Sequence, residues 1–298
     1  MADLPLSKES PTIMPMATEK LIATDLDGTL FYPKKTLRMV SKASRKFIDR
    51  FTDDGGRLVL VSGRTRFSCE KVAQKLGKKL DFIACNGACI VSNGTLIRDE
   101  SFEPEALKEM ISKITSKYPL MFPAIFTKHR GMVIKWSDLT RMVALGYRLY
   151  TFFQFNYREM FVCNDRVYYE ELEKGEVYKV LLMFGTSKKK IEMAEQATGD
   201  LAKEFPNASF AWSKQTVEVT PGSCTKSDGL LFYLDYNGFN RDNVLVVGDS
   251  GNDISMFDAF PETSFCMEHS PKSVQEHAAH VIGRFHELED FIYPSEEK

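Results

Sequence analysis

The sequence predicts an α/β protein: a Rossmann-like, doubly wound parallel sheet core with a large inserted α+β cap domain. Short continuous apolar runs recur along the chain, as expected of strands buried on both faces of a parallel sheet. Helical patterns separate some of these runs, which favours strand–helix–strand units. The middle of the chain differs, because it opens with a helical pattern and is then rich in aromatic residues.

The core domain is expected from four apolar runs, at residues 21–23, 58–61, 82–84 and 244–247. After the first run, apolar side chains follow at the spacing of one helix face: Leu37, Val40, Phe47, Ile48 and Phe51. We therefore expect the core domain at residues 19–99 and 215–298. Residues 1–18 combine Pro, Ser and mixed charge, which predicts a flexible N-terminal tail.

The inserted cap domain is expected at residues 100–214. Its first helix begins near Pro104, a residue that suits a first helical turn. One face of that helix carries an apolar stripe made of Leu107, Met110, Ile111 and Ile114. A strand at 177–184, a helix at 188–205 and strand-like sequence at 209–219 follow, which predicts an α+β unit.

Composition and charge argue against several classes of function. The net charge of −2 provides no basic surface for nucleic acid. No apolar run approaches the length of a membrane span, and the first residues lack the apolar stretch of a secretory signal. Six cysteines without a C-x-x-C pair indicate reduced thiols in a cytoplasmic protein. A metal or redox pair of Cys85 and Cys89 is the less favoured alternative.

Four polar motifs occur where the expected sheet would bind a ligand. The sequence DLDGTL at residues 25–30 follows the first expected strand, SGR at 62–64 follows the second, and GDSGND at 248–253 follows the run at 244–247. Lys226 lies near the expected start of a helix after the insert. The carboxyl ends of parallel strands meet at one edge of an open sheet, so the motifs should share one crevice.

The side chains in this crevice predict phosphoryl chemistry. Asp25, Asp27, Asp249 and Asp253 would repel one another unless a cation bound or some carboxyl groups kept their protons. Oxygen ligands favour Mg²⁺, which also binds substrate phosphate. The Ser62 hydroxyl and the Lys226 ammonium suit phosphate oxygens, and the backbone NH groups of residues 26–28 could cradle them.

Two of the carboxylates have the spacing for covalent catalysis. An aspartate nucleophile splits hydrolysis into two steps through an acyl phosphate, and Asp25 is the candidate. Asp27, two residues on, can protonate the leaving oxygen and later activate water. Each motif alone has a plainer interpretation: a hairpin turn at Asp27 and Gly28, a solvated surface lysine at Lys226. Their order along the chain and their placement at strand ends favour the functional interpretation.

The ordered set Asp-x-Asp-Gly-Thr, Ser-Gly-Arg, Lys and Gly-Asp-x-x-Asn-Asp resembles the haloacid dehalogenase-like (HAD) hydrolases, and most closely their Cof-like branch of sugar-phosphatase type. Members of that branch insert a large cap between the second and third motifs, as here. Asn86-Gly87, Pro221-Gly222 and Met256 agree with the resemblance, which covers roughly residues 19–292. Three departures leave the reactive groups in place: Ser62 for the frequent Thr, Ser227 for Gly, and His269-Ser270 for Asn-Ala.

The resemblance implies a role for each motif residue. Asp25 is the nucleophile and a metal ligand, and Asp27 is the general acid/base and gives its backbone carbonyl to the metal. Asp249 binds Mg²⁺ directly and Asp253 holds it through water. The implied phosphate-binding residues are Leu26, Gly28, Ser62, Gly63, Lys226 and Asn252. Arg64 receives no catalytic role, and its side chain is expected to structure the loop or face solvent.

The expected function is a Mg²⁺-dependent phosphatase acting on a small phosphorylated metabolite. A phosphomutase on the same scaffold is the first alternative, and a non-catalytic phosphometabolite-binding protein is the second. No obligate protein partner is evident, and the sequence does not identify the substrate. His129, Arg130 and Trp136 of the cap are candidate substrate contacts, although the cap aromatics are more often expected in a small core of the cap itself.

Overall fold

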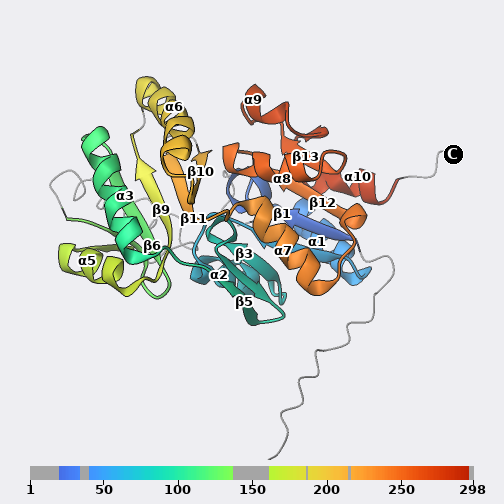
Figure 1. Ribbon diagram of the computed structural model, residues 1–298. Coiled ribbons are helices and arrows are strands. Elements are labelled where there is room, and N and C mark those ends of the chain that lie inside the picture. Colours follow the sequence, from blue (N-terminus) through green and yellow to red (C-terminus); the bar gives the residue numbers. More distant parts are fainter. Residues whose placement is uncertain (1–19, 34–39, 137–160, 186, 214–215, 295–298) are drawn as a thin grey trace, which may run out of the picture.

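The computed structural model describes residues 20–33, 40–136, 161–185, 187–213 and 216–294. The described strands form two sheets, each with its own helices (Figure 1). The expected tail at residues 1–18 lies outside the described residues, as does Leu37 of the first expected helix. None of the helices in the described ranges is long and apolar enough to cross a membrane.

The first sheet has eight strands in the order β14-β13-β12-β1-β2-β3-β4-β5. Six are parallel, namely β1 (Leu21–Thr24), β2 (Arg57–Val61), β3 (Asp81–Ala84), β12 (Val244–Gly248), β13 (Ser264–Met267) and β14 (His280–Ile282). Two antiparallel strands complete one edge, β4 (Cys89–Ser92) and β5 (Thr95–Asp99). The chain runs outward from β1 in one direction and returns to its other side at β12, which confirms the doubly wound core.

Helices cover both faces of this sheet. The sheet side chains alternate: Ile22 joins the apolar cluster of Phe47 and Phe51, whereas Leu21 joins the cluster of Leu230 and Phe257. The helices that line the two faces and the sheet edge are α1 (Lys42–Asp53), α2 (Arg66–Leu76), α7 (Lys226–Asn237), α8 (Ile254–Ala259), α9 (Lys272–Gln275) and α10 (Leu288–Ile292).

The first core helix begins later than its apolar pattern indicates. Ser41 is the N-cap of α1, and its hydroxyl oxygen accepts a hydrogen bond from the Ser44 amide at 3.0 Å. Val40 therefore lies before the helix, although it is buried in the same cluster as Phe47 and Phe51. The tertiary contact, rather than helical periodicity, accounts for its apolar character.

The second sheet has six strands in the order β10-β11-β9-β6-β7-β8. They are β6 (Phe122–Thr127), β7 (Gly131–Ile134), β8 (Phe161–Cys163), β9 (Val177–Met183), β10 (Ala208–Ser213) and β11 (Thr216–Pro221). One face packs against α3 (Pro104–Lys117), α5 (Asp165–Lys174) and α6 (Lys188–Glu204), which lie together on one side of Figure 1. This arrangement is the α+β architecture expected for the cap.

The expected cap boundary at residue 214 needs correction. β11 pairs with both β10 and β9, so the second sheet continues to Pro221. Residue 214 falls between the two strands of a hairpin, where a boundary would leave β10 and β9 without the strand that joins them. Residues 222–225 then lead directly to α7, and Thr225 caps that helix by accepting a hydrogen bond from the Asp228 amide.

All six cysteines lie in the described part of the chain, and none of them forms a disulfide. Cys85 and Cys89 are both buried in the apolar core of the first sheet. Burial raises the pKa of the Cys89 thiol to about 12, so it stays protonated. These residues act as small apolar side chains of the core.

Candidate active site

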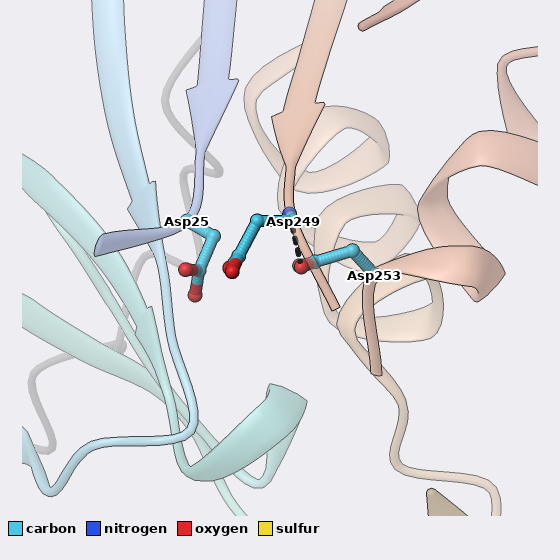
Figure 2. Close-up of side chains that lie close together, drawn as sticks. All are labelled: Asp25, Asp249 and Asp253. Atoms are coloured by element: carbon cyan, nitrogen blue, oxygen red, sulfur yellow. Dashed lines mark hydrogen bonds between the residues drawn. The ribbon is translucent and has the colours of Figure 1, made fainter. Parts of the chain in front are cut away.

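Three buried aspartates gather at the carboxyl edge of the first sheet. Asp25 follows β1, and its amide donates to the Val247 carbonyl at 2.9 Å, which holds the loops after β1 and β12 together. Asp249 and Asp253 belong to the loop after β12. Ligand atoms of Asp25, Asp249 and Asp253 all lie within 4.8 Å of one another, and Figure 2 shows their carboxylates side by side. Residues 224 positions apart in sequence thus share one site.

Lys226 connects two of these carboxylates. Its ammonium donates to Asp25 Oδ1 at 2.7 Å and to Asp253 Oδ1 at 2.6 Å, and its side chain is fully buried. Lys226 is the first residue of α7, so the Thr225 cap fixes where its side chain starts. Burial acts to lower the pKa of Lys226, but the charges of Asp25 and Asp253 outweigh it and raise the pKa above its usual value. The lysine is therefore a fixed cation.

The carboxylate cluster carries more negative charge than one lysine balances. Burial raises the pKa of Asp25 well above its usual range, and the charges of Asp253, Asp249 and Asp27 add to this effect against that of Lys226. The third member, Asp249, has His269 Nε2 at 3.5 Å from its Oδ2. A divalent cation placed among these oxygens would relieve the repulsion.

The loop after β12 holds Asp253 by hydrogen bonds to its own backbone. Asp253 Oδ2 accepts from the amides of Asp249 and Ser250, both at 2.9 Å. Opposite this loop lies Gly28, with φ of +93°. A Cβ on Gly28 would lie 2.2 Å from Asp249 Oδ2, so only glycine lets the two loops approach this closely.

Asp27 does not join the buried cluster. Arg64 donates to it through two hydrogen bonds, Nε to Oδ2 at 2.5 Å and Nη2 to Oδ1 at 2.8 Å. The Asp27 side chain is 45% exposed, in contrast to the buried aspartates. The expectation of four carboxylates in one crevice is therefore corrected to three, with Asp27 at its mouth. Arg64, expected only to structure its loop or face solvent, holds that fourth carboxylate.

The other expected phosphate-site residues lie around the same edge. Ser62, at the end of β2, is buried, and its amide donates to the Ile83 carbonyl at 2.8 Å. The Asn252 amide group is engaged at both ends: Oδ1 accepts from Ser250 Oγ at 2.8 Å, and Nδ2 donates to Glu218 Oε2 at 3.2 Å. Leu26 and Gly28 form the tight turn after Asp25.

A cavity of about 410 Å³ lies between β10 and α6 on one side and the starts of α7 and α8 on the other, and Asp25, Asp249 and Asp253 are not among its described lining residues. Asn86, Lys226 and Asn252 line it from the first sheet, and Phe210 and Trp212 of β10 line it from the second. His129, Arg130 and Trp136 are not among its described lining residues. Arg130 instead pairs with Glu171 at 3.0 Å, and His129 Nε2 lies 3.6 Å from Glu176, both within the second sheet's own unit.

Two charged residues of the second sheet reach this site and were not expected from the sequence. Lys179 on β9 and Glu218 on β11 contact loops of the first sheet and are nearly fully buried. A signal was available in both cases: each is a lone charged residue inside an apolar strand, in VYKVLLM and TVEVTP. A buried charge in a strand implies a specific partner, but the sequence does not identify that partner.

The sequence pattern of haloacid dehalogenase-like hydrolases matches residues 22–289, and the chain belongs to this family. The expected placement in its Cof-like branch is confirmed. The chain is therefore a hydrolase of the HAD superfamily, and its two sheets are the core and cap of that fold.

Individual relatives are similar along most of their length. The pyridoxal phosphate phosphatase YbhA of Escherichia coli (strain K12) is 24% identical over 273 residues, which cover 89% of this chain and 94% of the relative. The 5-amino-6-(5-phospho-D-ribitylamino)uracil phosphatase YwtE of Bacillus subtilis (strain 168) is 26% identical over 251 residues, covering 80% and 84%. A solved haloacid dehalogenase-like hydrolase from B. subtilis shares the fold, with a TM-score of 0.75, 20% identity and coverage of 92% and 99%.

Proposed function

We propose that the protein is a Mg²⁺-dependent phosphatase that hydrolyses a small-molecule phosphate monoester through an aspartyl phosphate on Asp25. The observation that carries this proposal is the buried Lys226 ammonium, 2.7 Å from Asp25 and 2.6 Å from Asp253, beside a third buried carboxylate. A fixed cation binds the phosphoryl group and clustered carboxylates bind a divalent metal, and phosphoryl transfer needs both at one site. The named phosphatases among the relatives support the same reaction.

The residues present fit Mg²⁺. Three buried carboxylates offer oxygen ligands within 4.8 Å of one another, and their charge exceeds that of the single lysine. Asp25 and Asp249 would hold the ion directly, with the Asp27 backbone carbonyl, and Asp253 would hold it through water. When bound, Mg²⁺ neutralises charge on the phosphoryl oxygens.

Hydrolysis then has two steps. A carboxylate oxygen of Asp25 attacks phosphorus, the bond from phosphorus to the leaving oxygen breaks, and Asp27 gives that oxygen its proton. In the second step Asp27 takes a proton from water, the water oxygen attacks the phosphorus of the acyl phosphate, and the Asp25 carboxylate departs. Inorganic phosphate results, Asp25 is a carboxylate again, and Asp27 again carries its proton.

The remaining site residues bind or orient the phosphoryl group. Lys226 and the Ser62 hydroxyl contact its oxygens, and the amides of Leu26, Gly28 and Gly63 surround them. Asn252 is committed to Ser250 and Glu218, which suits a residue that orients the loop. When substrate is present, one oxygen of Asp27 keeps its Arg64 bond, while the other takes up a proton and faces the leaving oxygen.

Phosphate release tests this proposal. Wild-type protein and Asp25→Asn would be assayed with sugar phosphates, nucleotides and pyridoxal phosphate, with and without Mg²⁺. Mg²⁺-dependent release that disappears in the variant is expected. A sugar phosphate that isomerises without releasing phosphate would show a phosphomutase instead. Tight binding of phosphorylated compounds without any turnover would show a binding protein.

A further inference from the structure

The second sheet inserts an ion pair between loops of the first. Glu218 on β11 lies opposite Leu181 of β9 in the antiparallel register, and Lys179 lies two residues from Leu181. All three therefore share one face of the sheet. Val180 and Val219 point to the other face, where the helices pack. Lys179 and Glu218 are 2% and 9% exposed, and Lys179 Nζ lies 3.5 Å from Glu218 Oε2.

Both members of this pair hydrogen-bond to the first sheet's loops. Glu218 Oε2 accepts from Asn86 Nδ2 at 2.5 Å and from Asn252 Nδ2 at 3.2 Å. Lys179 Nζ donates to the Gly63 carbonyl. The three partners come from the loops after β3, β12 and β2, so two cap side chains connect three separate loops.

Two of these loops carry residues assigned above to phosphate or metal binding, and the third hydrogen-bonds to one of those residues. Gly63 directly follows Ser62, and the Asn86 amide donates to the Ser62 carbonyl at 3.1 Å. Asn252 lies between Asp249 and Asp253, and it accepts from the same Ser250 whose amide holds Asp253. A shift of Glu218 would therefore reach both sides of the phosphate site.

The fit at this junction is close. A Cβ on Gly63 would lie 2.9 Å from Glu218 Oε2, 3.0 Å from Lys179 Nζ and 3.1 Å from Asn86 Oδ1. Asn86 itself has φ of +55°, a left-handed conformation that persists where surrounding contacts fix it. Burial would raise the pKa of Glu218, but Lys179, Asn86, Lys226 and Asn252 together lower it, so the carboxylate stays charged.

We infer that Glu218 and Lys179 are positioning residues for catalysis: from the cap, they hold the loops of Ser62, Asn86 and Asn252 in the arrangement that binds the phosphoryl group. This inference rests on the proposed function and adds to it. The cap then contributes to turnover of every phosphate ester, including those whose leaving group makes no specific contact with the cap.

The test uses p-nitrophenyl phosphate, a small ester, with the full chain in saturating Mg²⁺. Glu218→Ala is expected to lower kcat about 10- to 100-fold, the range for lost support of a site residue, with KM much less affected. Glu218→Gln keeps an acceptor oxygen for the two asparagines and should recover most of the rate. Lys179→Met should lower kcat as well, because the Gly63 carbonyl loses its donor.

Glu171→Ala is the matched control. Glu171 is also a buried cap carboxylate, 1% exposed, but its cationic partners Arg130 and Lys174 belong to the cap. Its loss should lower the thermal midpoint without changing kcat per folded molecule. If Glu171→Ala reduced kcat as much as Glu218→Ala, the effect would be one of cap stability and the inference would be wrong.

Binding of orthovanadate, measured by calorimetry, separates this inference from the proposed function. Glu218→Ala should weaken vanadate binding about tenfold, whether or not the wild type turns over. Wild-type protein that binds vanadate but releases no phosphate would overturn the proposed function alone. Unchanged kcat and unchanged vanadate affinity in Glu218→Ala would overturn the inference. If that variant does not fold, Lys179→Met decides by the same two readouts.

Discussion

Arg64 and Asp27 form a two-pronged ion pair at the mouth of the site, with Nε 2.5 Å from Oδ2 and Nη2 2.8 Å from Oδ1. The two residues come from loops after neighbouring strands, β1 and β2. The planar guanidinium matches the carboxylate at both oxygens, which fixes the orientation of the Asp27 side chain. Arg64, to which the sequence assigned no catalytic role, therefore controls where the proposed general acid Asp27 lies before substrate binds.

Arg64→Ala should lower kcat about tenfold while KM changes less, because Asp27 loses its restraint and samples unproductive orientations. Arg64→Lys should recover only part of the rate, since an ammonium cannot bind both oxygens in the same way. Steady-state kinetics with a small phosphate ester measures both variants. A kcat equal to that of the wild type in Arg64→Ala would show that the pair has no part in positioning Asp27.

Lys226→Met should destabilise the metal-free protein by about 3–5 kcal/mol, because the buried carboxylates of Asp25 and Asp253 lose their cation. Mg²⁺ should restore part of the loss. The free energy of unfolding in urea, with EDTA and then with Mg²⁺, measures this. The control is Lys174→Met, whose half-exposed lysine pairs with Glu171 and should cost about 1 kcal/mol or less. Equal losses in the two variants would contradict the assigned role of Lys226.

Mg²⁺ should raise the thermal midpoint of the wild type, because it binds the folded site and stabilises by about 2.7 kcal/mol at a hundred times its Kd. Asp249→Asn should remove most of this rise, since it takes away a charged ligand. Asp258→Asn is the control, because Asp258 is exposed on α8 and pairs with His277. Thermal melts at several Mg²⁺ concentrations decide the point, and a full Mg²⁺ shift in Asp249→Asn would exclude that residue as a ligand.

Gly28→Ala should lower the free energy of unfolding by about 1–3 kcal/mol, because residue 28 has a left-handed backbone conformation. The substitution should also impair Mg²⁺ binding. The added Cβ would lie 2.2 Å from Asp249 Oδ2 and must displace it. Gly199→Ala is the control, because Gly199 lies inside α6 with open space around it. This substitution should raise the free energy of unfolding by about 0.5–1 kcal/mol. Urea unfolding and Mg²⁺ titration measure both, and an unperturbed Mg²⁺ affinity in Gly28→Ala would contradict the close approach.

The charge of Glu218 should make the free energy of unfolding depend on pH in the acid range. Its pKa is lowered in the folded protein, so its stabilising contribution is present above the unfolded value of about 4.3. That contribution is lost as pH falls through the lower folded pKa. The difference in unfolding free energy between wild type and Glu218→Gln should therefore narrow below about pH 4.3. Urea unfolding across pH 3 to 6 tests this, and a difference that widens toward acid would contradict the lowered pKa.

The sequence identified those site residues that directly follow a buried strand. Asp25 and Asp249 follow buried apolar runs directly, so the rule that ligands bind at the carboxyl edge was enough to bring them together. β13 and β14 were not expected from the sequence. The strands of residues 89–99 form an antiparallel edge that apolar runs alone did not indicate.

What the sequence could not supply is the contact between the two sheets. Lys179 and Glu218 are 39 positions apart, and their meeting depends on the register of β9 against β11 and on how the cap sits over the core. The direction of the Asp27 side chain depends likewise on Arg64, from another loop. The cap boundary was misplaced at 214 because a two-strand hairpin has the same local pattern whichever domain holds it.

The most direct test of the central claim is to trap the phosphorylated enzyme. Wild-type protein would be mixed with Mg²⁺ and a substrate that it turns over, quenched in acid within one turnover, digested and analysed by mass spectrometry. The account predicts a phosphoryl group on the peptide that contains Asp25, and neither phosphoryl group nor turnover in Asp25→Asn. Turnover by Asp25→Asn at the wild-type rate, or a phosphoryl group on another residue, would contradict it.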